Sequence, residues 1–374
     1  MDDNNINLNE NNRANHTQNY YEVPYSQEIR REVLYRQKPV VVYILIAINI
    51  AMWAVLNLVS LKTGRSYNKL LIDFGAKVNI DILKGEYWRF ITPIFLHADI
   101  THLIVNCYSL YAVGPIVETI YGRTKFLFIY LTAGFFGSLL SFMFSINPSV
   151  GASGAIFGLL GALLYFGIEF PNLFKVYFGR SILITLAINL GYGLINTGID
   201  NLGHIGGLIG GFIASGIVQV RGNRKGKWIV NRTIFIVLIF VVTISGLIYG
   251  FNYGNNNVLL KIEELYELDA NQNWEEAASL GEELLKQKLI EKGLNIEVLW
   301  LTTKSEAITG NYSKAVEYAK ALVELSPRDG HYMLGIVYYD MGQFELAKEE
   351  LQKAKRLNAP YSNIDELIRS IEAR

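Results

Sequence analysis

Seven apolar stretches separate short polar segments along the first two thirds of the chain. They lie near residues 39–60, 100–121, 125–147, 153–169, 180–198, 203–220 and 233–251. The hydrocarbon core of a bilayer is about 30 Å thick and an α-helix rises about 1.5 Å per residue, so roughly 20 apolar residues cross it. The pattern therefore predicts an all-α chain that begins with a polytopic membrane helix bundle.

A polar tail precedes the first apolar stretch. Residues 4–19 are rich in asparagine and contain few apolar side chains that could be buried. We therefore expect residues 1–38 to form an N-terminal tail that is partly disordered. The first span begins at Pro39, behind this tail and without a cleavage-site pattern, which argues against a removable signal peptide.

Charge distribution predicts the orientation. The chain has 34 Lys and Arg against 34 Asp and Glu, but the basic residues gather in alternate short loops. They are Arg30, Arg31, Arg36, Lys38, Arg123, Lys125, Lys175, Arg180, Arg221, Arg224, Lys225 and Lys227. Basic loops stay on the cytoplasmic side, so we expect a cytoplasmic N-terminus and an extracytoplasmic C-terminal region. The arrangement of spans and loops favours a multi-pass protein of a bacterial plasma membrane. Its expected partners are lipid and other proteins, and no nucleic acid.

Polar side chains stand at the start of three apolar stretches. His97, His102 and Asn106 open the second stretch, Ser153 opens the fourth and His204 opens the sixth. Polar groups within a membrane are costly and usually functional. Alternate helices of a serpentine chain run in the same direction, so these residues share one depth near the outer surface. We predict that they form one site.

Ser153 and His204 predict a catalytic pair. A serine in a membrane helix often only bonds a backbone carbonyl one turn back. A histidine at the same depth favours another interpretation, because a neutral imidazole is the usual base for a serine hydroxyl. No acidic third member is evident. Asp99 and Asp200 are each interpreted as an exposed loop charge, with a carboxylate that orients the histidine as the alternative. Cys107 is the only cysteine and is interpreted as a small packed residue.

Acyl transfer also needs hydrogen-bond donors for the developing oxyanion, and one donor contributes about 100- to 1000-fold in rate. The Asn106 amide, the His102 ring N–H and the backbone N–H of Ser153 are candidates. An interhelical hydrogen bond explains Asn106 equally well, and His97 is better explained as a structural bridge to loop backbone.

Glycines predict that two of the spans lie very close together. They recur about every four positions, at Gly154, Gly158 and Gly161 in the fourth stretch and at Gly203, Gly206, Gly207, Gly210 and Gly211 in the sixth. Small residues at this spacing let two helix backbones approach.

In their order, these motifs resemble the rhomboid intramembrane serine proteases over roughly residues 39–252. The motifs are Trp88-Arg89, His97, His102, Asn106, Gly114, Glu118, Gly122, Gly151 through Gly154, and His204 through Gly207. The resemblance implies a six-helix core plus a seventh span, and a Ser153–His204 dyad that cleaves peptide bonds in or beside transmembrane segments. It implies Asn106 and His102 as oxyanion donors, and no metal or cofactor.

The resemblance also implies roles for supporting residues. Trp88 and Arg89 would sit in an outer loop between lipid and water. Many relatives have a tyrosine one turn after the nucleophile, where this chain has Phe157, so ring stacking on the histidine is retained without the hydroxyl. Glu118 is expected to be structural, bonded to loop backbone or placed near the cytoplasmic end.

The C-terminal region, residues 256–374, differs in composition and hydrophobic pattern. Charged, amphipathic segments carry an internal repeat of about 34 residues, close to the tetratricopeptide pattern. Gly310, Tyr312, Ala315 and Leu325 recur as Gly342, Phe344, Ala347 and Leu357, and Trp274 with Ala277 suggests an earlier copy. We expect about three stacked helix pairs. They either bind a peptide or protein partner or only shape access to the membrane domain.

Two other functions are compatible with parts of this pattern. A catalytically silent rhomboid-like scaffold would bind client helices and partners through its repeats, but it would not need both Ser153 and His204. A transporter would need paired broken helices, which the hydropathy pattern does not contain. An intramembrane serine endopeptidase is therefore the function that the sequence predicts.

Overall fold

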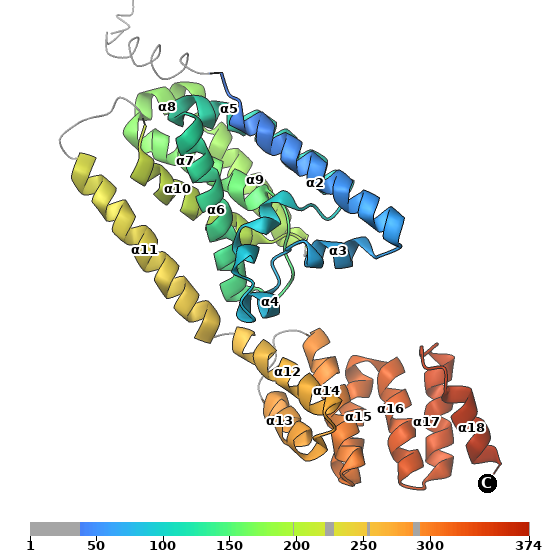
Figure 1. Cartoon of the computed structure of the whole chain (residues 1–374). Coiled ribbons are helices and arrows are strands. Elements are labelled where there is room, and N and C mark those ends of the chain that lie inside the picture. The colour runs from blue at the N-terminus through green and yellow to red at the C-terminus, as the bar shows by residue number, and fades with distance from the viewer. Residues whose placement is uncertain (1–37, 197, 221–227, 253–254, 287–291, 374) are drawn as a thin grey trace, which may run out of the picture.

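The computed structural model describes residues 38–196, 198–220, 228–252, 255–286 and 292–373. Within these ranges the chain consists of α-helices and two short 3-10 helices, and its one extended pairing is an antiparallel bridge between Lys77 and Ser149 (Figure 1). The all-α prediction is confirmed. The predicted N-terminal tail lies, apart from Lys38, outside the described residues.

Seven apolar helices form the membrane bundle. They are α2 (Val41–Thr63), α5 (Ile100–Tyr121), α6 (Arg123–Phe144), α7 (Ser153–Glu169), α9 (Ser181–Ile195), α10 (Asn201–Val218) and α11 (Trp228–Asn252). Four of them, and the apolar stretch that contains α11, are each long enough to cross a bilayer. The short helix α8 (Pro171–Tyr177) meets α9 at 69°, and together they make a sixth candidate span. The predicted multi-pass bundle is confirmed.

The central helix of the bundle is α7, which has only 17 residues. It packs against α5, α6 and α10, so most of its length contacts protein. Glycines make its contact with α10 very close: a Cβ added to Gly207 would lie 1.9 Å from the Gly154 carbonyl oxygen, and one added to Gly211 would lie 2.1 Å from that of Gly158. The predicted close approach of these two helices is present.

One acidic side chain anchors the start of α2. The carboxylate of Glu118, on α5, accepts hydrogen bonds from the backbone N–H groups of Val40, Val41 and Val42, at 2.7 to 2.9 Å. The first N–H groups of a helix have no partner within the helix. Glu118 therefore caps α2 from a neighbouring helix.

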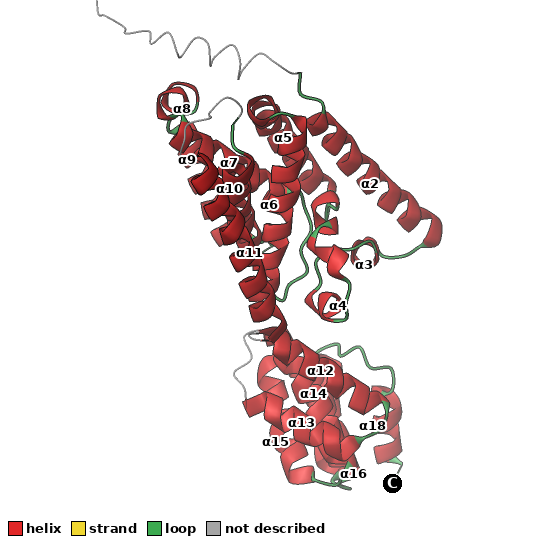
Figure 2. Cartoon of the chain, turned by 60° about the vertical axis from the view of Figure 1, so that its left-hand side comes forward, coloured by secondary structure: helices red, strands yellow, loops and turns green. Residues whose placement is uncertain are grey.

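A folded loop connects α2 to α5 at one end of the bundle. It contains α3 (Tyr67–Asp73), α4 (Asn79–Leu83) and the 3-10 helices η1 (Tyr87–Phe90) and η2 (Thr92–Phe95). Figure 2 shows this loop on the side of the bundle that faces the C-terminal helices. We call residues 64–99 the connecting loop.

The C-terminal helices stack as pairs. They are α12 (Asn255–Ala270), α13 (Trp274–Lys286), α14 (Lys292–Ile308), α15 (Tyr312–Leu325), α16 (Pro327–Asp340), α17 (Phe344–Arg356) and α18 (Ile364–Glu372). The turn within each pair has one residue with positive φ, which is Gln272 at 62°, Gly310 at 83° and Gly342 at 72°. Gln272 thus occupies the glycine position of the degenerate first copy. The expected array of three helix pairs is present, with α18 after it.

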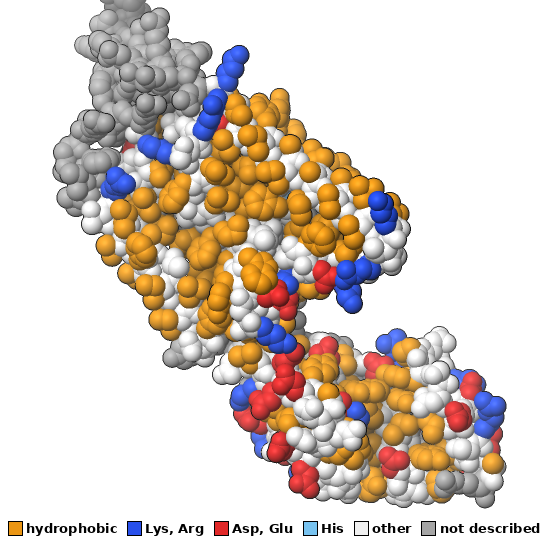
Figure 3. Space-filling view, viewed as in Figure 1, with side chains coloured by type: hydrophobic (Ala, Val, Ile, Leu, Met, Phe, Trp, Pro, Cys, Tyr) orange, Lys and Arg blue, Asp and Glu red, His pale blue; other side chains and the backbone are white. Residues whose placement is uncertain are grey.

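The surface also divides into two parts. Exposed apolar side chains cover the membrane bundle, whereas charged side chains lie near its ends and over the repeat domain (Figure 3). A protein surface of this kind matches a bilayer around the bundle and water around the repeats.

Candidate active site

Ser153 and His204 meet where α7 and α10 begin. Ser153 is the first residue of α7, and His204 lies in the first turn of α10. The glycine contact between the two helices brings these ends together, and His204 Nε2 lies 2.9 Å from Ser153 Oγ. This distance allows a proton to pass between hydroxyl and imidazole.

The imidazole of His204 is held by ring stacking. The Phe157 ring lies parallel to it, with centroids 4.2 Å apart and planes 7° apart. Among the described residues, no group hydrogen-bonds His204 Nδ1. The stacking expected of Phe157 is therefore present, although the stacked ring has no hydroxyl and no carboxylate holds Nδ1.

The two aspartates considered as orienting groups serve as helix caps. Asp200 accepts a hydrogen bond from the backbone N–H of Gly203 at the start of α10, at 2.8 Å. Asp99 accepts one from the N–H of His102 at the start of α5, also at 2.8 Å. Capping accounts for both carboxylates.

His102 lies beside Ser153. A Cβ added to Gly151, whose φ is +127°, would lie 2.7 Å from His102 Nε2 and 3.7 Å from Ser153 Oγ. Gly151 thus has no side chain where the imidazole sits. Asn106 is buried one turn further along α5, and its Nδ2 donates to the carbonyl oxygen of His102 at 2.9 Å. Three helix starts therefore contribute polar groups to one place.

His97 differs from its expected role. Its ring packs edge to face against His102 with centroids 5.3 Å apart, and neither ring nitrogen has a hydrogen-bond partner among the described residues. Its backbone carbonyl accepts a hydrogen bond from the Tyr67 hydroxyl at 2.9 Å. His97 thus lies within the connecting loop and contacts another part of it through its backbone, not through its imidazole.

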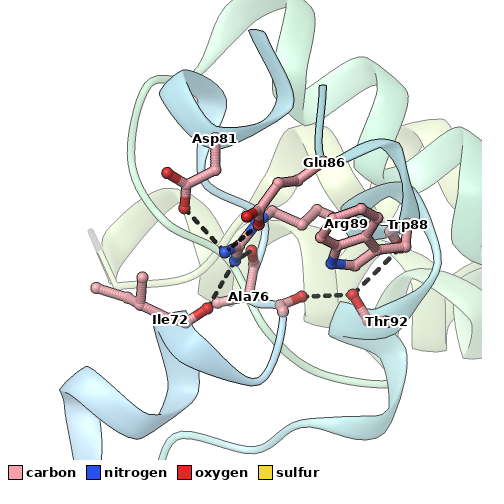
Figure 4. Close-up of polar contacts among 8 residues, drawn as sticks. Ile72, Ala76, Asp81, Glu86, Trp88, Arg89 and Thr92 are labelled. Carbon is pink, nitrogen blue, oxygen red and sulfur yellow. Dashed lines mark hydrogen bonds and ion pairs between the residues drawn. The ribbon is translucent and has the colours of Figure 1, made fainter. Parts of the chain in front are cut away.

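Trp88 and Arg89 behave differently from each other (Figure 4). Trp88 is 56 % exposed, as a residue between lipid and water can be. Arg89 is 4 % exposed and pairs with Asp81 at 3.0 Å and Glu86 at 2.6 Å. The two carboxylates draw the guanidinium inward, where it also donates to the carbonyl oxygens of Ile72 and Ala76. Arg89 therefore holds the connecting loop together and does not face the lipid boundary expected from the sequence.

Sequence reasoning missed a second buried polar cluster, formed by Lys77, Asn79 and Asn256. Lys77 and Asn79 lie in the connecting loop and Asn256 lies in α12. The available signal was a lysine within an apolar segment of that loop, but nothing in the sequence indicates a partner 177 positions away from Asn79.

Comparisons with known proteins agree with this architecture. Residues 84–222 match the rhomboid domain, and residues 329–361 match a tetratricopeptide repeat. The chain is 38 % identical over 303 residues to rhomboid protease GluP of Bacillus subtilis, an alignment that covers 80 % of this chain and 58 % of that protein. It is 30 % identical over 235 residues to rhomboid protease AarA of Providencia stuartii, covering 54 % of this chain and 82 % of that protein.

A plant protein matches over a shorter region. RHOMBOID-like protein 4 of Arabidopsis thaliana is 32 % identical over 196 residues, which cover 47 % of this chain and 49 % of that protein. The chain thus spans less than two thirds of this relative and of GluP, but most of AarA. On these matches, and on the membrane bundle and helical repeats described above, the chain belongs to the rhomboid family and carries a tetratricopeptide repeat at its C-terminal end.

Proposed function

We propose that this chain is an intramembrane serine endopeptidase that cleaves peptide bonds in or beside transmembrane segments of membrane proteins. The observation that carries the proposal is the 2.9 Å contact between Ser153 Oγ and His204 Nε2 at the adjoining ends of two helices. A serine that only satisfied its own helix would not need this partner. The relatives named rhomboid proteases support the same reaction class.

In the proposed reaction, Ser153 is the nucleophile and His204 is the general base. Ser153 Oγ attacks the carbonyl carbon of the scissile bond while His204 Nε2 takes the hydroxyl proton. The tetrahedral intermediate collapses when the same imidazole gives this proton to the leaving amine, which breaks the C–N bond. Water then attacks the acyl-enzyme with His204 again as base, and the free hydroxyl is regenerated.

The oxyanion donors proposed are the Asn106 side-chain amide, the His102 ring N–H and the backbone N–H of Ser153. The third donor lies at the start of α7, where the helix dipole favours negative charge. In this structure the Asn106 amide donates to the His102 carbonyl. It would have to turn toward the oxyanion when substrate binds, since such contacts often tighten only during the reaction.

We assign three parts of the chain to this function. Residues 39–252 form the membrane protease domain, residues 256–374 form helical repeats that contact a protein or peptide partner, and residues 1–38 precede them as a cytoplasmic tail. Substrates are proteins whose transmembrane helix can unwind locally, because the scissile carbonyl must leave its helical hydrogen bond to reach Ser153. The active site faces the extracytoplasmic side in this assignment.

The test combines covalent trapping with cleavage of a model transmembrane substrate in vesicles. A serine-directed phosphonate should label wild type at Ser153, and mass mapping identifies the residue without knowledge of the natural substrate. Ser153→Ala and His204→Ala should each abolish both labelling and cleavage. Ser215→Ala is the matched control, since this buried serine lies on the same helix as His204 and donates to the Gly211 carbonyl one turn back. It should retain both labelling and cleavage.

The competing function is a silent scaffold that binds client helices. It predicts no labelling of Ser153 in wild type and no difference between wild type and the two dyad variants. That result would reject the proposed protease.

A further inference from the structure

The connecting loop contains a fully buried ammonium group. Lys77 has no exposed surface, and its Nζ donates to Asn79 Oδ1 at 3.0 Å. It also donates to the carbonyl oxygens of Ser145 at 3.0 Å and Asn147 at 2.7 Å, which follow the end of α6. A buried charge requires such partners, because moving it away from water is otherwise very costly. Lys77 therefore holds the segment that leaves α6 against the connecting loop.

Asn79 extends this contact to the repeat domain. Its Nδ2 donates to Asn256 Oδ1 at 2.6 Å, and both side chains are 1 % exposed. Asn256 Nδ2 in turn donates to the carbonyl oxygens of Phe142, at 2.9 Å, and Gly250, at 2.7 Å. Asn256 lies in the first turn of α12, so the first helix of the repeats is joined to the ends of α6 and α11.

The same lysine also contacts the loop that leads into α7, just before Ser153. The backbone of Lys77 pairs with that of Ser149 through two hydrogen bonds of 2.9 and 3.0 Å. Two residues later, the Gly151 N–H donates to the Pro93 carbonyl at 2.9 Å, and Ser153 follows at the start of α7. A continuous set of contacts thus connects Asn256 to the segment 147–152.

We propose that Lys77, Asn79 and Asn256 are positioning residues that couple the seating of the repeat domain to the conformation of segment 147–152, and so to the nucleophile. The catalytic consequence rests on the proposed protease function. Asn79 Nδ2 also donates to the carbonyl oxygens of Phe142, at 3.1 Å, and Ser145, at 3.0 Å. Displacing α12 therefore removes one of three acceptors from the Asn79 amide, and it removes the Asn256 donor from the Phe142 carbonyl. Buried hydrogen bonds in one network strengthen each other, so the loss of these two bonds weakens the hold of the connecting loop on the end of α6.

This coupling gives the repeats a defined role. A protein that binds the repeats and tilts α12 would change the conformation of segment 147–152, and so the position of Ser153. It would do this without contacting the substrate. The repeats are then a regulatory element of the membrane domain and more than a tethered binding module.

The deciding measurement is hydrogen exchange of the full chain in lipid nanodiscs. Asn256→Ala removes the contact from the repeat side. Asn79→Asp keeps an acceptor for Lys77 while removing the donor to Asn256 and to the carbonyl oxygens of Phe142 and Ser145. In both variants the Ser149 and Gly151 amides should exchange about tenfold faster than in wild type. Amides in the middle of α7 and α10 should stay protected, which shows that the bundle is folded.

Lys84→Ala is the matched control. It removes a surface ion pair between the connecting loop and Glu263 of α12, but it leaves the buried cluster intact. Its Ser149 and Gly151 amides should exchange as in wild type. Unchanged exchange in Asn256→Ala, or equal acceleration in Lys84→Ala, would overturn the proposed coupling.

Phosphonate labelling of the same samples separates this inference from the proposed function. If wild type is labelled at Ser153, the labelling rate should fall about tenfold in Asn256→Ala and stay unchanged in Lys84→Ala. If wild type is not labelled, the protease function fails, while the exchange rates still decide whether the repeats and segment 147–152 are coupled.

Discussion

At the scale of single residues, the orientation of His204 depends on an aromatic ring. In a serine triad, a carboxylate on the second imidazole nitrogen fixes the ring orientation. Here Nδ1 of His204 has no partner among the described residues, and Phe157 stacks on the ring face with planes 7° apart. Stacking restrains the tilt of the imidazole, but it does not stabilise a positive charge on the ring as a carboxylate would. The candidate site therefore has ring packing where a serine triad has a carboxylate.

Replacing Phe157 tests this dependence. Phe157→Tyr keeps the ring and should label with phosphonate within about threefold of wild type. Phe157→Ala removes a contact worth about 0.5–1.5 kcal/mol, so labelling should be about 2- to 10-fold slower. Labelling rates at equal protein concentration provide the measurement. Equal rates for wild type and Phe157→Ala would show that stacking does not orient His204.

The other residue-scale prediction concerns acid stability. Burial lowers the pKa of His97 from its ordinary value near 6.5 to about 3, with a smaller contribution from neighbouring His102, while Asp99 acts in the opposite direction. Because the folded state prefers neutral His97, this contribution to stability is complete above pH 6.5 and declines as the pH falls toward 3.

His97→Phe should remove this dependence. Wild type should lose thermal stability between about pH 6 and pH 4, and the variant should lose less over the same range. The measurement is the midpoint of thermal unfolding in detergent at several pH values. Parallel curves for both proteins would show that His97 is not the group responsible.

At the scale of helices, the site depends on how closely α7 and α10 approach. The serine and the histidine are 51 positions apart in sequence, and their 2.9 Å contact requires the two helix starts to be side by side. Gly154 and Gly207 provide this, because each lacks a side chain that would separate the backbones. The contact between Ser153 and His204 is thus a consequence of glycine packing.

Gly207→Ala should break that packing. The added methyl group would lie 1.9 Å from the Gly154 carbonyl oxygen, which belongs to backbone and cannot turn aside. We expect a loss of stability of about 1–3 kcal/mol and phosphonate labelling reduced at least tenfold. Gly191→Ala on α9 is the control, because nothing lies within 4 Å of its added Cβ. Wild-type labelling in Gly207→Ala would contradict the packing argument.

At the scale of the whole molecule, the repeat domain and the active site share one end of the bundle. Asn256 of α12 contacts the end of α6, and segment 147–152 leads from that end to Ser153. In the orientation that we propose from the basic loops, this end lies on the extracytoplasmic side. Both the candidate site and the repeats then face the same compartment.

Cysteine labelling of intact cells tests the orientation. In a Cys107→Ser background, Glu275→Cys places a thiol on an exposed position of α13, and Lys175→Cys places one on exposed α8. A membrane-impermeant maleimide should label the α13 position in intact cells and the α8 position only after permeabilisation. The reverse pattern would mean that the repeats are cytoplasmic.

The sequence by itself determined the helical class, the multi-pass character of the bundle and the repeats, because hydrophobic periodicity and turn residues are local properties. It also predicted that Ser153 and His204 share a depth, since alternate helices of a serpentine chain run the same way. The Glu118 prediction followed from the cost of an unpaired acid within a membrane.

Only the tertiary structure decided which polar groups meet. The inward turn of Arg89 depends on two carboxylates of a folded loop, and the stacking distance at His204 depends on the contact of α7 with α10. The buried polar cluster joins positions as far apart in the sequence as Lys77 and Asn256, which are 179 residues apart. Hydrogen bonds are short and directional, so their partners follow from the three-dimensional path of the chain and not from the pattern along it.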